Sequence, residues 1–351
     1  DFSGLGDWNV NEKKLPGGLA PLAQRTNDLG MKVGLWVEPE MVSEDSDLYR
    51  AHPDWAFQVP GRPMTRGRSQ LVLDLTRQEV REYILENLRT TLKSAHIEYV
   101  KWDMNRSLTD VWSARLPVNR QGEIYHRYVL GVYEILEAIH REFPDLLIEG
   151  CSGGGGRFDC GMLHYTPQIW CSDNTDAMDR LRIQYGTSFC YPCAAVGAHV
   201  SATPNCMTHR TTPMHTRGVV AAAGTFGYEL DLNEITDEEL EEVRRQITHF
   251  KTCWDLVLRG DYYRLSNPFA EEPFQAWMHV SPDKDRALVG VVMDKIHANP
   301  CRPRLRLKGL DPQADYRVNG TVYGGDQLMY AGLALPVLDE YEAVQYDIEK
   351  V

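Results

Sequence analysis

Apolar runs alternate with amphipathic segments through the first three quarters of the 351-residue chain. The runs predict strands at 31–37, 70–75, 97–103, 146–151, 168–173, 194–200 and 225–232. Between the runs, apolar residues recur at helical spacing, as at Val80, Ile84, Leu88 and Leu92. This alternation is typical of parallel strands that are covered by helices.

Two further helices are predicted between these strands. One covers about 124–143, with Tyr128, Ile135 and Ile139 on its apolar face. The other begins at Thr236 and carries Leu240, Val243, Ile247, Phe250 and Trp254. Thr76 and Thr236 each precede a glutamate by three residues, which is the signature of a capping box at the start of a helix.

The seven strands share polar residues at their carboxyl ends, which is where a (β/α)₈ barrel carries its active site. Seven strands rather than eight suggest that the first strand lies upstream of Asp1. A doubly wound open sheet is the rival fold, but it gives no reason for polar residues at every strand end. The expected fold is therefore an α/β (β/α)₈ TIM barrel whose first strand is missing.

After residue 260 the pattern changes to short strands with partial alternation, separated by Pro, Gly and Asp turns. These strands are predicted at 276–280, 287–293, 304–307, 316–318 and 344–348. They indicate a C-terminal antiparallel β-sandwich. The expected domains are a catalytic barrel over 1–259, truncated at its N-terminus, and a β-sandwich over 260–351.

Composition narrows the possible partners. The net charge of −13 leaves no basic stripe for phosphates, so nucleic acid is excluded, and an acidic substrate is disfavoured. No apolar run approaches the roughly 20 residues that span a bilayer, so no membrane partner is expected. A neutral sugar remains compatible with these values.

The eight cysteines, Cys301 among them, are scattered along the chain, and several lie in apolar runs. This usage is typical of reduced thiols in an intracellular protein and favours a cytoplasmic location.

The strand ends carry the candidate chemistry. Lys101, Asp103 and Asn105 face one way along an extended strand, and Asp173 follows another strand directly. A cation, a carboxylate and an amide at one point suit a site that binds hydroxyls. Other strand ends add Trp36, Glu38, Asp74 and Cys151, with Arg66 and Arg68 just before the 70–75 run. The His pairs of a zinc site are absent from these positions, so no metal and no cofactor are predicted.

Local charge assigns the two carboxylates different tasks. Retaining glycoside cleavage uses two carboxyl groups about 5–5.5 Å apart, one ionised and one protonated. Lys101 favours the ionised form of Asp103, which suits a nucleophile. Asp173 has no cation in its own segment, and a negative Asp103 across the barrel mouth would favour its protonated form. Asp176 is expected to cap the following helix or to pair with Arg180.

At these residues the chain resembles glycoside hydrolase family 36, and within it the bacterial α-galactosidases. The segments that match the family are GLWVEPEM at 34–41, HPDW at 52–55, QLVLD at 70–74, KWDMN at 101–105, CSGGG at 151–155, SDNTD at 172–176 and GAHVS at 197–201. They occur in the family's order and run through most of the chain.

The resemblance implies a retaining α-galactosidase that acts on oligosaccharides such as raffinose and melibiose. It implies Asp103 as the nucleophile and Asp173 as the general acid/base. The galactose contacts that it implies are Trp36, Arg68, Lys101, Asn105, Cys151 and Gly154. It also implies a homotetramer. Because the family's N-terminal domain and first-strand aspartates are not in this sequence, the isolated 351 residues are expected to have little activity.

Several alternatives stay open at this level. An α-N-acetylgalactosaminidase or a transglycosylase that makes raffinose-type sugars would use the same scaffold. A catalytically inactive sugar-binding barrel belongs to a different class, although both carboxylates are present. A metal-dependent barrel hydrolase would use His199, His209 and Cys206.

Overall fold

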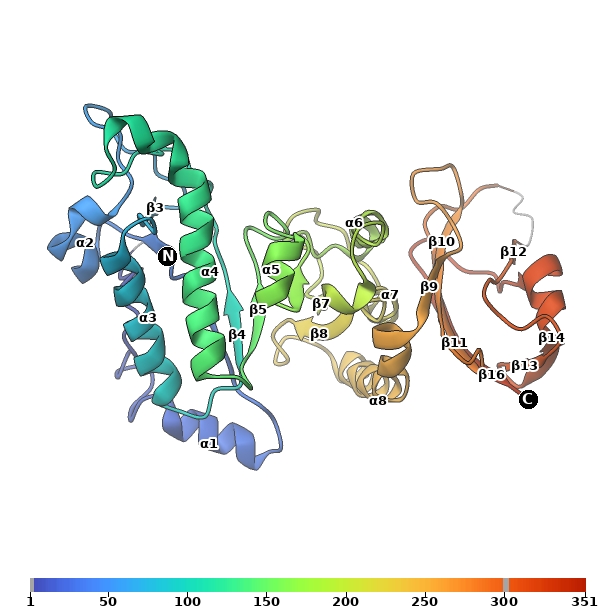
Figure 1. Cartoon of the computed structure of the whole chain (residues 1–351). Helices are drawn as coiled ribbons and strands as arrows, with labels where there is room; N and C mark the ends of the chain where they lie inside the picture. The colour runs from blue at the N-terminus through green and yellow to red at the C-terminus, as the bar shows by residue number, and fades with distance from the viewer. Residues whose placement is uncertain (1–2, 299–302) are drawn as a thin grey trace. The chain divides into compact units, whose positions relative to one another are not determined.

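The structure of the chain is a computed structural model that describes residues 3–298 and 303–351, so Cys301 lies outside the described residues. The chain divides into two compact units, Asp1–Trp170 and Cys171–Val351, called unit 1 and unit 2 below. Figure 1 labels their helices and strands.

Unit 1 is built on four parallel strands in the order β1-β4-β5-β6. Their bounds are Gly34–Val37, Tyr99–Trp102, Leu147–Gly150 and Gln168–Trp170. In this register Trp36 lies opposite Lys101, and Lys101 lies opposite Glu149. Because parallel strands end at the same edge, the residues that follow β1, β4 and β5 are brought together there.

Unit 1 contains several α-helices. They are α1 Ala20–Asp28, α2 Asp47–Ala51, α3 Gln78–Lys93, α4 Ile124–Glu142 and α5 Cys160–Tyr165. Of these, α3 and α4, the two that the sequence predicts, bury the faces that their apolar spacing predicts. The buried residues of α3 are the four predicted ones, and α4 buries all three predicted positions. Long helices α3 and α4 lie side by side (Figure 1). Their apolar faces join the strands in one core.

Two predictions for unit 1 are wrong. The run at 70–75 does not join the parallel strands: only β3 Leu71–Val72 is extended, and it pairs antiparallel with β2 Met41–Val42. Thr76 forms no capping box, because α3 begins two residues later, after an Arg77 N-cap without a side-chain bond. The Thr76 N–H, from which the Glu79 carboxylate would accept in a capping box, donates instead to Asp74 Oδ1 at 3.0 Å.

Unit 2 begins with three α-helices and a pair of parallel strands. These elements are α6 Ala177–Thr187, β7 Val196–Ser201, α7 Met214–Ala221, β8 Thr225–Glu229 and α8 Asp237–Arg259. The capping box predicted at Thr236 is confirmed, with both of its hydrogen bonds present. Trp254, expected on the apolar face of α8, is 44% exposed, and Cys253, Leu256 and Val257 are buried instead.

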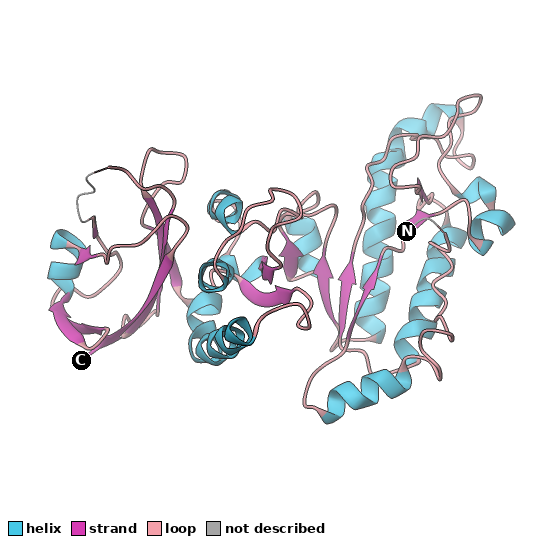
Figure 2. Cartoon of the chain, turned by 180° about the vertical axis from the view of Figure 1, so that it is seen from behind, coloured by secondary structure: helices cyan, strands magenta, loops and turns pink. Residues whose placement is uncertain are grey.

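The rest of unit 2 is antiparallel. One sheet has the order β14-β13-β16-β11-β10-β9, and β12 pairs with β15 in a separate ladder. The bounds in chain order are β9 Asp261–Arg264, β10 Phe274–Val280, β11 Arg286–Met293, β12 Arg304–Leu305, β13 Asp315–Val318, β14 Thr321–Gly324, β15 Leu333–Ala334 and β16 Ala343–Lys350. Residues of the six-stranded sheet and of the β12–β15 ladder share one apolar core, as in a sandwich. Figure 2 shows these strands in magenta from behind.

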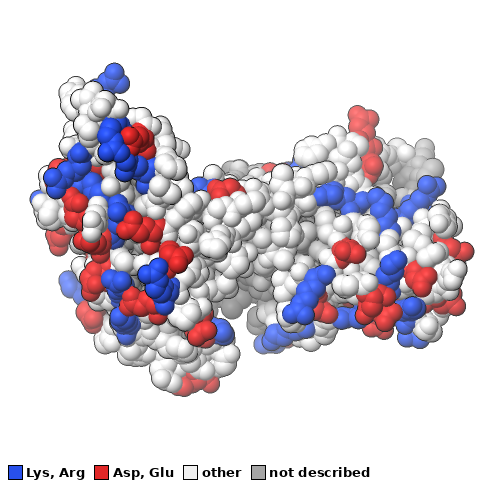
Figure 3. Space-filling view, in the orientation of Figure 1, with Lys and Arg blue, Asp and Glu red and all other residues white. Residues whose placement is uncertain are grey.

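The predicted boundary at 259/260 stays a prediction, although α8 ends and antiparallel pairing begins at that point. No helix among the described residues is long and apolar enough to cross a membrane. On the face of unit 1 that Figure 3 shows, acidic and basic side chains are interspersed around α3 and α4.

Candidate active site

Asp103 is a buried carboxylate that accepts hydrogen bonds from several donors. It follows β4 directly, and its own N–H donates 2.8 Å to the carbonyl of Val37 at the end of β1. Trp36 Nε1 and Asn105 Nδ2 donate to its Oδ2 at 3.2 and 2.6 Å, and the Met104 N–H donates to its Oδ1 at 2.8 Å. Donors of this kind stabilise a negative charge on a carboxylate.

The thiol of Cys151 is a further donor to Asp103. Cys151 follows β5, where its N–H donates 2.7 Å to the carbonyl of Trp102. Burial, the nearby charge of Asp103 and the hydrogen bond to Asp103 raise the pKa of this thiol well above its usual range. The S–H group therefore stays protonated near neutral pH and can donate to the carboxylate.

Lys101 forms its ion pair with Glu149, at 3.3 Å, rather than with Asp103. The sequence predicts that Lys101 is the cation that favours an ionised Asp103. In the described residues the groups that contact the Asp103 oxygens are instead the N–H and S–H donors.

Glu38 and Asp74 hold the surrounding backbone. Glu38 is fully buried and accepts from the Asn105 N–H at 2.7 Å and from Gln70 Nε2 at 3.0 Å. Burial, and then the charge of Asp103, raise the pKa of Glu38. Asp74 accepts from Thr76 and Ser113, and burial raises its pKa. The sequence suggests Glu38 and Asp74 as partners of Lys101 or Arg68. The hydrogen bonds described here go to Asn105 and Gln70 for Glu38, and to Thr76 and Ser113 for Asp74.

The glycine-rich loop after β5 presents Cys151 and Gly154. Gly153 and Gly154 have φ of +54° and +81°, a left-handed backbone that glycine adopts without a Cβ clash. Arg157 anchors the loop, because its Nε donates 2.6 Å to Ser152 Oγ while its Nη2 lies 2.9 Å from Glu40.

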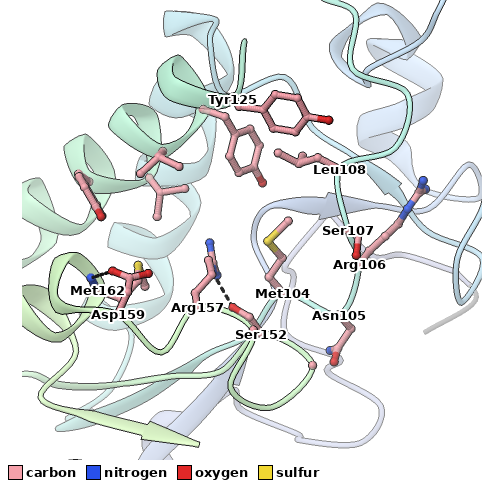
Figure 4. A pocket seen from close by; sticks show the side chains of 16 residues that line it. Met104, Asn105, Arg106, Ser107, Leu108, Tyr125, Ser152, Arg157, Asp159 and Met162 are labelled. Atoms are coloured by element: carbon pink, nitrogen blue, oxygen red, sulfur yellow. Dashed lines mark hydrogen bonds between the residues drawn. The ribbon is translucent and has the colours of Figure 1, made fainter. Parts of the chain in front are cut away.

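Glu40 is the buried centre of this anchor. It also accepts from Trp102 Nε1 at 2.7 Å and from the Tyr128 hydroxyl at 2.6 Å. A cavity of about 590 Å³ lies beside Arg157, between α4 and the loops after β4 and β5 (Figure 4). The sequence reasoning missed Glu40 and Arg157, since a glutamate without a nearby basic residue gives no signal of its partner.

Arg68 lies in the turn before β3, and both it and Ser69 have left-handed backbones, with φ of 53° and 60°. Such conformations are uncommon outside glycine and accompany tight turns, here one that links Gly67 to Gln70. The turn separates Arg68 from the buried strand and leaves it exposed.

In unit 2, Asp173 is exposed, and the backbone carbonyls of the residues before and after it both accept hydrogen bonds from one arginine. Arg180 donates to the carbonyls of Ser172 at 2.8 Å and Asn174 at 2.7 Å, and to that of Gly197 at 3.0 Å. Because Arg180 is buried and its guanidinium is planar and rigid, it fixes the chain on both sides of Asp173.

Asp176 caps α6, as predicted, by accepting from the Met178 and Asp179 N–H groups. Its ion pair is with Arg210, whereas the sequence suggested Arg180. Asp176 and Asp173 therefore differ in their local structural roles. Asp176 is buried and caps the helix, whereas Asp173 does not.

Within the ranges 3–298 and 303–351, no group of three or more His, Cys, Asp or Glu residues is arranged to hold a metal ion. His199, named for the metal-dependent alternative, lies 3.4 Å from Glu229.

Comparison with known proteins gives the family. Residues 1–260 match the melibiase family model, and residues 274–348 match the model of the glycosyl hydrolase family 36 C-terminal domain. The chain therefore belongs to the melibiases of glycoside hydrolase family 36.

Individual relatives are similar over the whole chain. It is 54% identical over 349 residues to the bifunctional α-galactosidase/sucrose kinase AgaSK of Mediterraneibacter gnavus, covering 99% of this chain and 36% of AgaSK. It is 54% identical over 337 residues to the α-galactosidase AgaA of Geobacillus stearothermophilus, covering 96% of this chain and 46% of AgaA. The chain thus spans about half the length, or less, of these curated relatives.

Solved structures agree with the fold. The α-galactosidase AgaB of Geobacillus stearothermophilus superposes with a TM-score of 0.98 at 52% identity, covering all of this chain and 49% of AgaB. An AgaA variant in complex with raffinose gives a TM-score of 0.97 at 51% identity, covering 99% of this chain and 49% of that one. The expected fold class, a (β/α)₈ barrel followed by C-terminal antiparallel β-structure, is confirmed.

Proposed function

We propose that this chain carries the catalytic centre of a retaining α-galactosidase, which hydrolyses terminal α-linked galactose from neutral oligosaccharides such as raffinose and melibiose. The observation that carries the proposal is the buried Asp103 at the end of β4, with N–H and S–H donors on its carboxylate. Support comes from the relatives named α-galactosidases, and from AgaA structures that contain raffinose or stachyose.

The two AgaA complexes give a further reason to choose Asp103 and Asp173. Each complex was obtained with a variant in which one aspartate is replaced, and the two aspartates differ between the complexes. They are separated along that chain by the same number of positions as Asp103 and Asp173 are here. Replacing a catalytic carboxylate is a common way to trap a substrate unhydrolysed.

In the first step, a carboxylate oxygen of Asp103 attacks the anomeric carbon from the β face. The bond from that carbon to the glycosidic oxygen breaks, and the Asp173 carboxyl gives its proton to the leaving oxygen. The product is a β-galactosyl ester on Asp103. The neutral ester removes one negative charge from the site, which allows Asp173 to remain ionised.

In the second step, the Asp173 carboxylate takes a proton from water as the water oxygen attacks the anomeric carbon from the α face. The ester bond breaks, α-galactose leaves, and both carboxyl groups return to their starting states. The donors on Asp103 stabilise the carboxylate that departs in this step. We propose that Trp36, Arg68, Lys101, Asn105, Cys151 and Gly154 contact the galactose.

The test is Asp103→Gly in the full-length protein that carries this sequence, assayed with an aryl α-galactoside. We expect hydrolysis to fall by about 10⁴-fold, as when a covalent nucleophile is lost. Added azide should restore partial turnover and yield β-galactosyl azide, because azide enters from the face that the carboxylate vacated. The product configuration is read by NMR.

An α-azide product from this variant, or full activity without the carboxylate, would reject Asp103 as the nucleophile. Wild-type protein that binds galactose but never turns over would favour the inactive sugar-binding barrel. Loss of turnover after chelation would favour the metal-dependent alternative.

We also propose a homotetramer and a cytoplasmic location. The tetramer rests on the family resemblance alone. The location is supported by the seven cysteines among the described residues, all of which are free thiols. Light scattering on the purified full-length protein measures the oligomeric state, and cell fractionation measures the location.

A further inference from the structure

A buried carboxylate with no role in the mechanism above lies one strand away from Lys101. Glu149 on β5 is in register with Lys101 on β4 and with Gln168 on β6. Its side chain is 2% exposed. Burying a carboxylate is costly unless it is paired and hydrogen-bonded, so the groups around Glu149 indicate what it is used for.

The two oxygens of Glu149 have different partners. Oε2 accepts from Gln168 Nε2 at 2.6 Å and from the Tyr99 hydroxyl. Burial, and then the charge of Glu149, raise the pKa of Tyr99, so this phenol remains a donor. Oε1 lies 3.3 Å from Lys101 Nζ, and no other polar group in the described part of the chain bonds to it.

Lys101 is held from two sides. Besides the Glu149 carboxylate, the ring of Trp170 on β6 lies 4.7 Å from its ammonium, measured to the ring centroid. The Lys101 side chain keeps 22% of its surface exposed. An ammonium has three N–H donors, so a carboxylate and a ring on two sides leave room for a hydroxyl ligand.

We propose that Glu149 is a positioning residue that holds the Lys101 ammonium ready for galactose; this rests on the proposed function. A lysine side chain is long and flexible, and ordering it at the moment of binding weakens affinity. The Glu149 carboxylate and the Trp170 ring order it beforehand, at the edge where Asp103 also lies. Tyr99 and Gln168 in turn fix the carboxylate.

The test is Glu149→Gln in the full-length protein, with an aryl α-galactoside as substrate. Glutamine keeps the shape and an acceptor for Tyr99 but removes the charge that attracts Lys101. We expect KM to rise about tenfold, the size of one lost charge-assisted hydrogen bond, with kcat changed less than about threefold. A merely structural role would lower the folded fraction and leave KM unchanged.

Two further variants separate action through Lys101 from a general effect. In a Lys101→Met background, Glu149→Gln should cause little additional loss, because the partner is already gone. Glu98→Gln is the matched control, since Glu98 pairs at 3.2 Å with Lys32, which is 79% exposed. KM should stay within about twofold for this control, because exposed pairs contribute little.

An unchanged KM in Glu149→Gln, or effects of the two substitutions that multiply, would overturn the proposal. Calorimetric titration with galactose provides a readout that does not need turnover. If the wild type binds galactose but hydrolyses no α-galactoside, the proposed function fails while weaker binding by Glu149→Gln still supports the positioning role.

Discussion

The segments that carry Asp103 and Asp173 both follow a parallel strand, yet they are held in different ways. Asp103 is buried, and donors contact its carboxylate oxygens directly. Asp173 is exposed, and Arg180 holds the backbone carbonyls on either side of it. In unit 1 donors reach the carboxylate itself, and in unit 2 an arginine holds the backbone on both sides of the aspartate.

This difference matches the two tasks proposed for them. A nucleophile must be ionised when substrate arrives, and donors on its oxygens favour that state. A general acid/base must release and regain a proton in every cycle, so exposure to solvent and a firm loop suit it better.

The strongest test of the contrast is the same azide experiment applied to Asp173. In Asp173→Gly we expect kcat/KM for melibiose to fall by about 10³-fold, and by much less for a substrate whose leaving group needs no proton. Azide should now give α-galactosyl azide, because the Asp103 ester still forms and azide takes the place of water. NMR of the product distinguishes the variants, and a β-azide here would reverse the two roles.

Arg180→Lys tests whether the loop is what positions Asp173. Lysine lacks the planar guanidinium that reaches three carbonyls here. We therefore expect kcat/KM for melibiose to fall by about 10²-fold, the cost of a small misplacement of Asp173. Activated aryl substrates should lose less.

The control for Arg180→Lys is Arg182→Lys, on the same helix, whose side chain is 41% exposed and lies 3.4 Å from Asp294. Its kinetics should match the wild type. Equal losses in both variants would mean that a general weakening of α6, rather than the loop, is responsible.

Trp36→Phe tests the direct donors on Asp103. The change keeps a ring but removes the N–H that lies 3.2 Å from Oδ2, and we expect kcat/KM to fall about tenfold. Trp8→Phe is the control, because the buried Nε1 of Trp8 has no hydrogen-bond partner in the described residues. Steady-state rates measured for both variants show whether the Trp36 N–H contributes to catalysis. Similar losses in the two variants would show that ring packing matters rather than the donor.

The smallest effect concerns stability and pH in unit 1. Because burial raises the pKa of Glu38, its contribution to stability is complete below the pKa of the unfolded chain and is lost as pH rises through the higher folded pKa. Glu38→Gln lacks this titration. We therefore expect the Tm of the variant, relative to the wild type, to increase between pH 4 and 7 by a few degrees.

Calorimetric scans across that range measure the change. A difference in Tm that stays constant or decreases with pH would show that ionising the buried Glu38 does not destabilise the folded protein.

Two identical sequence signals had opposite outcomes. Thr76 and Thr236 each stand three residues before a glutamate, and only Thr236 forms the capping box. Thr236 accepts from the Glu239 N–H even though its side chain also bonds to Glu238, whereas the N–H and the hydroxyl of Thr76 both donate to Asp74, two residues earlier. Asp74 is buried and needs donors, so the tertiary position of one neighbour decides the outcome.

The apolar run at 70–75 shows the same limit for strands. Its composition predicts a buried strand, and Leu71, Val72 and Leu73 are indeed buried. Its pairing is antiparallel to Met41–Val42, because the partner and direction of a strand depend on where the rest of the chain folds.

The sequence by itself determined the buried faces of α3 and α4, the barrel class and the position of Asp103 at a strand end, because helical spacing and strand alternation are local properties. Only the tertiary structure decided that Lys101 pairs with Glu149 and that Arg157 reaches Glu40. Charged partners far apart in sequence carry no periodic signal. They find each other because a buried charge must be paired wherever the folded chain places it.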